Sequence, residues 1–271
     1  MNKFIKAAPI TSMKDAFSVK GFNVLVTGGN SGIGRGIVEA FAESGANVAV
    51  LALDINDAKR TVEEIGRYGG RNLAAQCDVT DYDSVKAARD EVFAFFDNLD
   101  VLVNNAGVGG KVHFMEEGGL DDWHRVINTN MNGAANMIHE FCKPMCEAGR
   151  GGSVINISSI GGQSIGDAKV HPNAPYNASK AGLDHFMHYM SVIFGDYAIR
   201  INCIAPGPTH SDLEKDMPAS LFETIENKMP MHRFGEPIEI GALAVFLASP
   251  AGRHITGTVI VHDGGTLVTG M

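Results

Sequence analysis

Residues 23–34 read Asn-Val-Leu-Val-Thr-Gly-Gly-Asn-Ser-Gly-Ile-Gly, and this stretch indicates how the whole chain folds. Its first half, Asn23–Thr27, is a short apolar run typical of a buried strand. A helical pattern follows the glycines at once, with Ile37, Val38 and Phe41 on one face. A strand, a glycine loop and a helix in this order point backbone N–H groups at a pyrophosphate. The spacing T-G-x-x-x-G-x-G therefore favours dinucleotide binding, and the alternative is an ordinary turn.

The same alternation of strands and helices continues towards the C-terminus. We expect strands at residues 23–27, 47–53, 73–77, 99–103, 153–157, 200–204 and 258–261. We expect helices after Gly34 and at residues 55–68, 84–96, 123–145, 176–194 and 238–247. Such alternation implies right-handed crossovers and a parallel sheet. The predicted fold class is α/β, one doubly wound parallel sheet with helices on both faces and ligands at the C-terminal strand edges.

The composition suits one globular domain. The chain has 271 residues and 28.8 kDa, of which 45% are hydrophobic and 20% charged, so a sizeable core can form. A net charge of −9 argues against nucleic acid or an anionic membrane as partner. No apolar run approaches the ~18 residues of a membrane span, and residues 1–20 do not read as a signal peptide. We expect residues 1–20 to form an arm, flexible or draped over a neighbouring subunit, and residues 21–271 to form the domain.

The cysteines and histidines carry no metal signature. Only Cys142 and Cys146 lie close together, and four residues on a helix is not the spacing of a zinc knuckle. With Cys77 and Cys203 they are expected to be packed, reduced thiols in a cytoplasmic protein. The ten histidines include no H-E-x-x-H motif. No metal site is predicted.

A second informative stretch is Tyr176-Asn177-Ala178-Ser179-Lys180. If it lies on a helix, positions four apart point to nearly the same side. An ammonium beside a phenol favours the phenolate and suits the tyrosine to proton transfer. The alternative is a helical tyrosine and lysine with solvated ends.

Taken in order along the chain, these motifs resemble the short-chain dehydrogenase/reductase family from about residue 21 to residue 265. The resemblance rests on Thr27-Gly28, Gly32-Ile33-Gly34, Asp78, Asn104-Asn105-Ala106-Gly107, Asn130, Ser159, Tyr176 with Lys180, Pro206-Gly207 and Asp263-Gly264-Gly265. It implies a single Rossmann-type domain that binds a nicotinamide cofactor. It also implies an enzyme that moves a hydride to or from a carbonyl carbon.

The resemblance implies a catalytic role for four residues. Tyr176 is the acid/base, and Lys180 favours its phenolate and binds the nicotinamide ribose. Ser159 fixes the substrate oxygen, with Ser158 the weaker candidate, and Asn130 holds a relay water. Hydride transfer creates alkoxide character, which such donors stabilise. Without the Tyr–Lys pair, the serines would read as a strand-end cap and the asparagine as a polar helical residue.

The cofactor-binding residues that the resemblance implies are Gly28, Asn30, Ser31, Gly32, Ile33, Gly34, Asp54, Asp78, Val79, Asn105, Ala106, Gly107, Tyr176, Lys180, Pro206, Gly207, Thr209 and Ser211. The two positions at which the family often carries positive charge for NADP are Ser31 and about Leu53, and neither is basic. Ala52 stands where the family usually carries its NAD-selecting aspartate, but a carboxylate at Asp54, a residue or two later, would bind the ribose hydroxyls, so NAD(H) is favoured. Arg35 leaves NADP(H) open, and the alternative role of Asp54 is to cap the helix that follows.

Two segments bear on the substrate, and they disagree. The 17 positions from Ser159 to Tyr176 exceed the usual family spacing, and the polar insertion within Gly161–Pro175 favours a hydroxylated substrate. Its polar residues are Asp167, Lys169, His171 and Asn173, and surface solvation is their alternative role. A substrate lid is expected at about residues 208–235, with the apolar residues Leu213, Met217, Leu221, Phe222, Met229 and Met231. These could line an apolar pocket or pack against the body of the protein.

We therefore expect an NAD(P)-dependent oxidoreductase that interconverts a secondary alcohol and a ketone. A sugar, sugar acid or polyol is the first choice, a hydroxysteroid or other apolar ketone the second, and an acyl thioester the third. The alternative class is a non-catalytic dinucleotide-binding sensor. The family further implies a homotetramer or homodimer built on helices 123–145 and 176–194. His185, Met187, His188 and Met190 would then lie partly at the interface.

Overall fold

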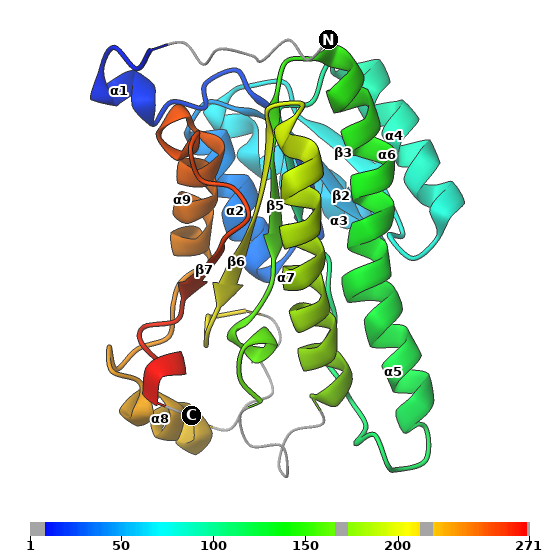
Figure 1. Ribbon diagram of the computed structural model, residues 1–271, viewed down its shortest axis with the longest axis vertical. Coiled ribbons are helices and arrows are strands. Elements are labelled where there is room, and N and C mark those ends of the chain that lie inside the picture. The colour runs from blue at the N-terminus through cyan, green and yellow to red at the C-terminus, as the bar shows by residue number, and fades with distance from the viewer. Residues whose placement is uncertain (1–8, 166–172, 212–218, 270–271) are drawn as a thin grey trace.

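The computed structural model describes residues 9–165, 173–211 and 219–269, and they contain one seven-stranded sheet (Figure 1). The strands are β1 Asn23–Thr27, β2 Asn47–Ala52, β3 Leu73–Gln76, β4 Val101–Asn104, β5 Gly152–Ile157, β6 Ile199–Pro206 and β7 Val259–His262. Their order is β3-β2-β1-β4-β5-β6-β7, and each neighbouring pair runs parallel. The order reverses between β1 and β4, which opens the crevice where ligands bind in such sheets. The predicted doubly wound parallel sheet is confirmed.

Helices cover both faces of the sheet (Figure 1). One face carries α2 Gly32–Glu43, α3 Ile55–Ile65 and α9 Pro237–Ala248, and the other carries α4 Tyr82–Phe95, α6 Gly133–Ala148 and α7 Ala174–Gly195. Each face buries its own apolar cluster, one around Phe41 and the other around Phe141. Along β1, Val24 and Val26 join the first cluster and Leu25 the second, because successive side chains of a strand point to opposite faces. Continuous apolar strands are what a sheet buried on both faces requires.

The remaining elements are short or lie near the ends of the sheet. They are α1 Met13–Ala16, η1 Gly66–Tyr68, α5 Gly119–Ile127, η2 Asn128–Asn132, η3 Ile160–Gly162, α8 Ala219–Lys228, η5 Pro250–Gly252 and η6 Leu267–Thr269. Within the described ranges, none of the helices has the length and apolarity that a bilayer crossing requires.

The helix predicted at residues 123–145 is longer and is not uniform. It starts as α5, passes through the π turn η2 and continues as α6 (Figure 1). A π turn inserts one residue into an α-helix, and such turns concentrate at functional sites. Asn130, one of the predicted catalytic residues, lies in the middle of this turn and is buried.

Part of the predicted N-terminal arm packs on its own chain. Ala16 is 2% exposed and Val19 is fully buried in the same cluster as β1. The ring of Phe17 lies 6.1 Å from that of Phe246 on α9. Residues 16–19 therefore contact α9 and the sheet of their own chain, while the expectation that the arm is flexible or draped over a neighbouring subunit stays a prediction. Residues 1–8 lie outside the described residues.

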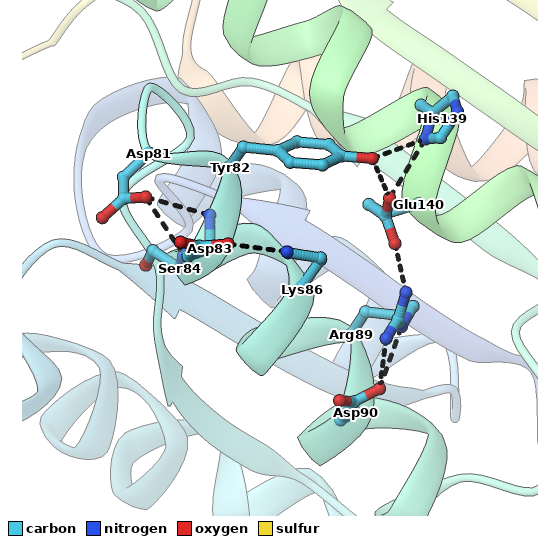
Figure 2. Close-up of polar contacts among 9 residues, drawn as sticks. All are labelled: Asp81, Tyr82, Asp83, Ser84, Lys86, Arg89, Asp90, His139 and Glu140. Carbon is cyan, nitrogen blue, oxygen red and sulfur yellow. Dashed lines mark hydrogen bonds and ion pairs between the residues drawn. The ribbon is translucent and has the colours of Figure 1, made fainter.

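A polar network joins the outer helices α4 and α6 (Figure 2). Tyr82 and Arg89 of α4 donate hydrogen bonds to the Glu140 carboxylate of α6, which is 6% exposed. His139 Nδ1 lies 3.0 Å from the Tyr82 hydroxyl and 3.0 Å from Glu140. The Tyr82 hydrogen bond, helped by His139 and Arg89, outweighs burial and lowers the pKa of Glu140. The network holds α4 on the helix that carries the π turn.

Candidate active site

A cleft of about 350 Å³ lies at the C-terminal ends of β1, β4, β5 and β6. It brings together most of the predicted residues: Gly28, Ser31, Gly32, Ile33, Gly34, Asn105, Ala106, Gly107, Ser159, Tyr176, Lys180, Pro206, Gly207, Thr209 and Ser211. Val108, Ile157, Ser158 and Pro208 also line it. The C-terminal ends of parallel strands meet at one edge of the sheet, which is why residues so far apart in the sequence converge.

The glycine loop is shaped to receive a phosphate group. Gly28 and Gly32 have positive φ angles of 62° and 49°, which side chains disfavour. A Cβ atom on Gly34 would lie 2.2 Å from the carbonyl oxygen of Gly28, so only glycine fits there. Ser31, the N-cap of α2, makes no side-chain cap hydrogen bond within the described part of the chain. The first N–H groups of α2 therefore border the cleft uncapped, which fits the pyrophosphate of a dinucleotide.

The loop after β4 is tied to the glycine loop. Thr27 Oγ1 accepts hydrogen bonds from the backbone N–H groups of Asn105 and Ala106, both at 3.0 Å. Asn105 Nδ2 donates to the carbonyls of Thr27 and Gly28 at 2.9 and 3.1 Å. These bonds fix two cleft walls against each other, so part of the Asn104–Gly107 motif is structural.

Tyr176 and Lys180 lie together on α7, as their spacing predicts. Lys180 is 4% exposed, and its Nζ lies 5.5 Å from the centroid of the Tyr176 ring. Nζ also donates a hydrogen bond of 2.7 Å to the backbone carbonyl of Ile157, the last residue of β5. A carbonyl has no sequence signature, so the sequence could not identify this contact. It fixes the ammonium near the Tyr176 ring.

Ser159 and Asn130 both make structural contacts as well. Ser159 Oγ accepts from the Gly161 N–H at 3.0 Å and caps η3, while the residue lines the cleft. Asn130 Oδ1 accepts from the Val108 N–H at 2.8 Å, and its Nδ2 donates to the Val108 carbonyl at 3.0 Å and to Ser179 Oγ at 3.1 Å. The Asn130 amide thus fixes the loop after β4, and the residue is not among those that line the cleft.

Asn30 and Asp54 are also absent from the cleft lining. Asp54 is the N-cap of α3, and its Oδ1 accepts from the Asn56 N–H at 2.8 Å. The structure thus shows the capping role that the sequence left as an alternative. Leu53, beside it, is 68% exposed.

Asp78 and Val79, in the loop after β3, do not line the cleft. Asp78 Oδ1 accepts from the N–H and the hydroxyl of Thr80, at 2.8 and 2.7 Å. The Val79 carbonyl accepts from Asn136 Nδ2 at 3.0 Å, and a Cβ atom on Gly133 would lie 2.6 Å from the Val79 side chain. This loop is therefore held closely against the start of α6.

A larger hollow of about 720 Å³ lies between the loop after β4 and the start of α7. None of the four predicted catalytic residues lines it, whereas Ser159, Tyr176 and Lys180 line the smaller cleft. Its lining combines the apolar residues Phe114, Met115 and Ile165 with the polar residues His113, Gln163, Ser164, Asn173 and Asn177. Asp167, Lys169 and His171 of the predicted insertion lie outside the described residues.

The predicted lid packs against the body at its C-terminal half. Met229 is 1% exposed, and a Cβ atom on Gly264 would lie 3.4 Å from its methyl group, while the rings of Phe222 and Phe234 lie 4.9 Å apart within the lid. Met231 is 61% exposed. The predicted lid residues Leu213 and Met217 lie outside the described residues.

On α7, Met187 is fully buried in the core, so its expected place at a subunit interface is wrong. The outward-facing apolar residues of that helix are Tyr189, Val192 and Ile193. Met190 packs against the core while half-buried. His185 and His188 are exposed.

Residues 28–266 match the family model described as enoyl-(acyl carrier protein) reductase. The chain belongs to the short-chain dehydrogenase/reductase family. It is 36% identical over 242 residues to the 3-oxoacyl-(acyl-carrier-protein) reductase of Chlamydia trachomatis, covering 89% of this chain and 95% of that one. It is also 36% identical over 250 residues to the D-threitol dehydrogenase of Mycolicibacterium smegmatis, covering 92% and 94%.

A solved structure shares the fold over nearly the whole chain. It is a short-chain type dehydrogenase/reductase from Mycobacterium marinum, with a TM-score of 0.88, 32% identity and coverage of 94% of this chain and 99% of that one. Family members of this kind use nicotinamide cofactors, and the cleft has the glycine loop that such a cofactor needs. The chain is thus an NAD(P)-dependent oxidoreductase that acts on CH–OH groups.

Proposed function

We propose that this enzyme interconverts a secondary alcohol and a ketone with NAD(H), and that its substrate is a sugar, sugar acid or polyol. The observation that carries the reaction is the Lys180 ammonium, fixed at the Ile157 carbonyl beside the Tyr176 ring. Both side chains lie in the cleft into which the glycine loop opens.

Each proposed catalytic residue has a distinct task. The Tyr176 hydroxyl gives its proton to the ketone oxygen in reduction and takes the alcohol proton in oxidation. Lys180 stabilises the phenolate and binds the nicotinamide ribose, and Ser159 donates to the substrate oxygen. Asn130 holds the relay water through its backbone, because Val108 and Ser179 engage its amide. A bound nicotinamide supplies or accepts the hydride.

Replacing Tyr176 with phenylalanine tests these roles. Tyr176→Phe should leave NADH binding nearly intact and lower kcat by about 10²–10⁴-fold, the usual contribution of general acid–base catalysis. Tyr197→Phe is the matched control, since Tyr197 lies just beyond the end of α7 and is 44% exposed. NADH oxidation is measured with a panel of ketoses, diketones and 3-, 7- and 12-ketosteroids. Wild-type turnover by Tyr176→Phe on the best substrate would refute the assignment.

The proposed preference for NAD(H) rests on charge around the adenosine end of the cleft. Ser31 and Leu53 are uncharged, and Asp54 places a carboxylate after β2. Arg35, the basic residue that could hold a 2′-phosphate, donates to Glu64 Oε2 at 2.5 Å. That pairing neutralises the guanidinium and holds it against α3.

The cofactor preference is tested by breaking the ion pair between Arg35 and Glu64. Glu64→Gln should raise kcat/KM for NADPH relative to NADH, and Glu63→Gln, at an exposed neighbouring position, should not. A tenfold or greater preference of the wild type for NADPH would overturn the proposal. Asp54→Ala with Leu53→Arg should move the preference further towards NADPH.

The substrate class rests on the large hollow next to the cleft. Its polar side chains His113, Gln163, Asn173 and Asn177 can bind several hydroxyl groups, which favours a sugar or polyol. The two relatives at 36% identity carry names with different substrates, so similarity does not choose between them. Turnover of ketoses above that of ketosteroids supports the proposal, and the reverse order contradicts it.

A second candidate substrate is an acyl thioester. Phe114 and Met115 are 46% and 91% exposed at this hollow, and they could contact an acyl chain. The relative named 3-oxoacyl-(acyl-carrier-protein) reductase adds to this candidate. Reduction of a 3-oxoacyl thioester faster than any ketose would favour it.

We also propose a homotetramer or homodimer that buries the outer face of α7. Tyr189 and Val192 are 68% and 78% exposed on this face. Light scattering that gave only a 28.8 kDa species at micromolar concentration would count against it. The four cysteines are free, which suits the predicted cytoplasmic location.

A further inference from the structure

A row of buried polar side chains crosses the sheet just below the cleft. Asn104 of β4, Asn156 of β5 and Cys203 of β6 are paired in register. Asn104 Nδ2 donates to Asn156 Oδ1 at 2.9 Å, and Asn156 Nδ2 lies 4.0 Å from Cys203 Sγ. All three are at most 5% exposed. Because they are in register, their side chains project from one face, the face that α7 covers.

The row leads to Asp184, a carboxylate on α7 that the reaction as described does not use. Asp184 follows Lys180 by four residues, so the two share a helix face. It is 7% exposed, and burial raises its pKa. Burial, helped by the nearby Asp184 carboxylate, also raises the pKa of the Cys203 thiol. The polar row thus ends at a buried acid one turn beyond Lys180.

Ser158 and Cys203 are the neutral side chains that this carboxylate faces. The Ser158 hydroxyl opposes the rise in the pKa of Asp184 that burial causes. Among the described residues, neither Ser158 Oγ nor Asp184 Oδ1 has a partner at ordinary hydrogen-bond geometry. Buried polar atoms are nearly always paired, so each of these two is the natural partner of the other. Along the chain, Ser158 lies between Ser159 and Ile157, and the carbonyl of Ile157 accepts the hydrogen bond from Lys180.

The loop after Ser159 rests directly on the turn of α7 that carries Asp184. A Cβ atom on Gly162 would lie 3.0 Å from the backbone of Lys180 and 3.1 Å from Asp184 Oδ2. The remaining charged neighbours of Asp184 are Lys180 and His188 on the same helix. A hollow of about 430 Å³, lined also by His185, borders its outer side.

We propose that Asp184 is a positioning residue, whose carboxylate holds Ser158 and thereby fixes the Ile157 carbonyl and Ser159 relative to Lys180. This inference rests on the proposed roles of Ser159 and Lys180. Removing either member of a buried polar pair leaves the other without a partner, and the strand end then relaxes. Lys180 moves with the Ile157 carbonyl, so both cofactor binding and turnover change.

A double-mutant cycle tests the pairing. Asp184→Leu and Ser158→Ala should each raise the NADH Kd, measured by fluorescence titration, and lower kcat by about tenfold, as expected for loss of one charge-assisted hydrogen bond. The double variant should be no worse than the poorer single variant, because both changes break the same contact. Asp184→Asn keeps an oxygen that Ser158 can bind, so it should restore kcat to near the wild-type value.

Ser153→Ala is the matched control. Ser153 is another buried serine whose hydroxyl has no partner among the described residues, but it lies near the start of β5, whereas Ser158 follows the end of that strand. The Ser153→Ala variant should change the urea concentration at the midpoint of unfolding without changing the NADH Kd or kcat. A merely structural role for Asp184 predicts the same pattern for Asp184→Leu.

Three results would overturn the proposal: wild-type Kd and kcat for Asp184→Leu, additive effects in the cycle, or Asp184→Asn as poor as Asp184→Leu. If Asp184→Leu does not fold, Ser158→Ala and Asp184→Asn decide, and wild-type Kd and kcat for Ser158→Ala overturn it. Failure of the proposed function shows separately, as undiminished turnover by Tyr176→Phe. The NADH Kd values still test the positioning role in that case.

Discussion

A single methyl group at Gly34 should disable the cofactor loop. The Cβ atom of Gly34→Ala would lie 2.2 Å from the Gly28 carbonyl oxygen and 2.4 Å from Asn105 Nδ2, where ordinary contacts begin at 3.4 Å. The Gly28 carbonyl must therefore retreat by about 1 Å, a displacement that can cost a positioned site about 10²-fold. Both displaced atoms belong to one hydrogen bond of 3.1 Å between the two cleft walls. We expect the NADH Kd to rise by about 10²-fold.

The assay separates lost binding from lost folding. Fluorescence titration gives the NADH Kd, and urea unfolding should show a cost of about 1–3 kcal/mol, as for other overpacked sites. Gly66→Ala is the control, because a Cβ atom there has no neighbour within 4 Å and the residue has ordinary helical φ and ψ angles. It should bind NADH normally and be as stable as the wild type or slightly more so. Gly34→Ala with a Kd within about threefold of the wild type would show that the loop does not hold the cofactor.

Two further predictions concern stability. Arg89→Ala leaves the buried Glu140 carboxylate without its cation (Figure 2), so it should lower the urea midpoint at pH 7 more than Arg60→Ala, which breaks an exposed pair. Tyr82, His139 and Arg89 lower the pKa of Glu140 below its usual value near 4.5, so its stabilising effect is present above that pH and is lost as the pH falls through the lower folded pKa. The stability gap between the wild type and Glu140→Gln should therefore close in acid, and a gap independent of pH would contradict this. Arg200 donates to three carbonyls at the end of α9 and in the turn after it, and burial lowers its pKa to about 10. Arg200→Leu should lower the free energy of unfolding by on the order of 3 kcal/mol, and an unchanged urea midpoint would refute that.

The sequence by itself determined the succession of strands and helices along the chain and the pairing of Tyr176 with Lys180. Asn23–Gly34 predicts strand, loop and helix because periodicity and glycine are local properties of the chain. Tyr176 and Lys180 lie together because helical geometry alone places residues four apart on one side. The edge at which the motifs meet follows from parallel strands, whose C-terminal ends share one side of the sheet.

Tertiary structure decided which face of each element is buried and what each polar atom contacts. Met187 and Tyr189 are two residues apart on α7, yet one is in the core and the other is exposed, because the strands beneath set the buried face. Spacing could not show that the Ile157 carbonyl binds Lys180, since every residue has such a carbonyl. Asp184 is as close to Lys180 in sequence as Tyr176 is, but it is buried only because β5 and β6 lie side by side under α7. Local geometry fixes which residues share a helix face, and long-range packing fixes what that face meets.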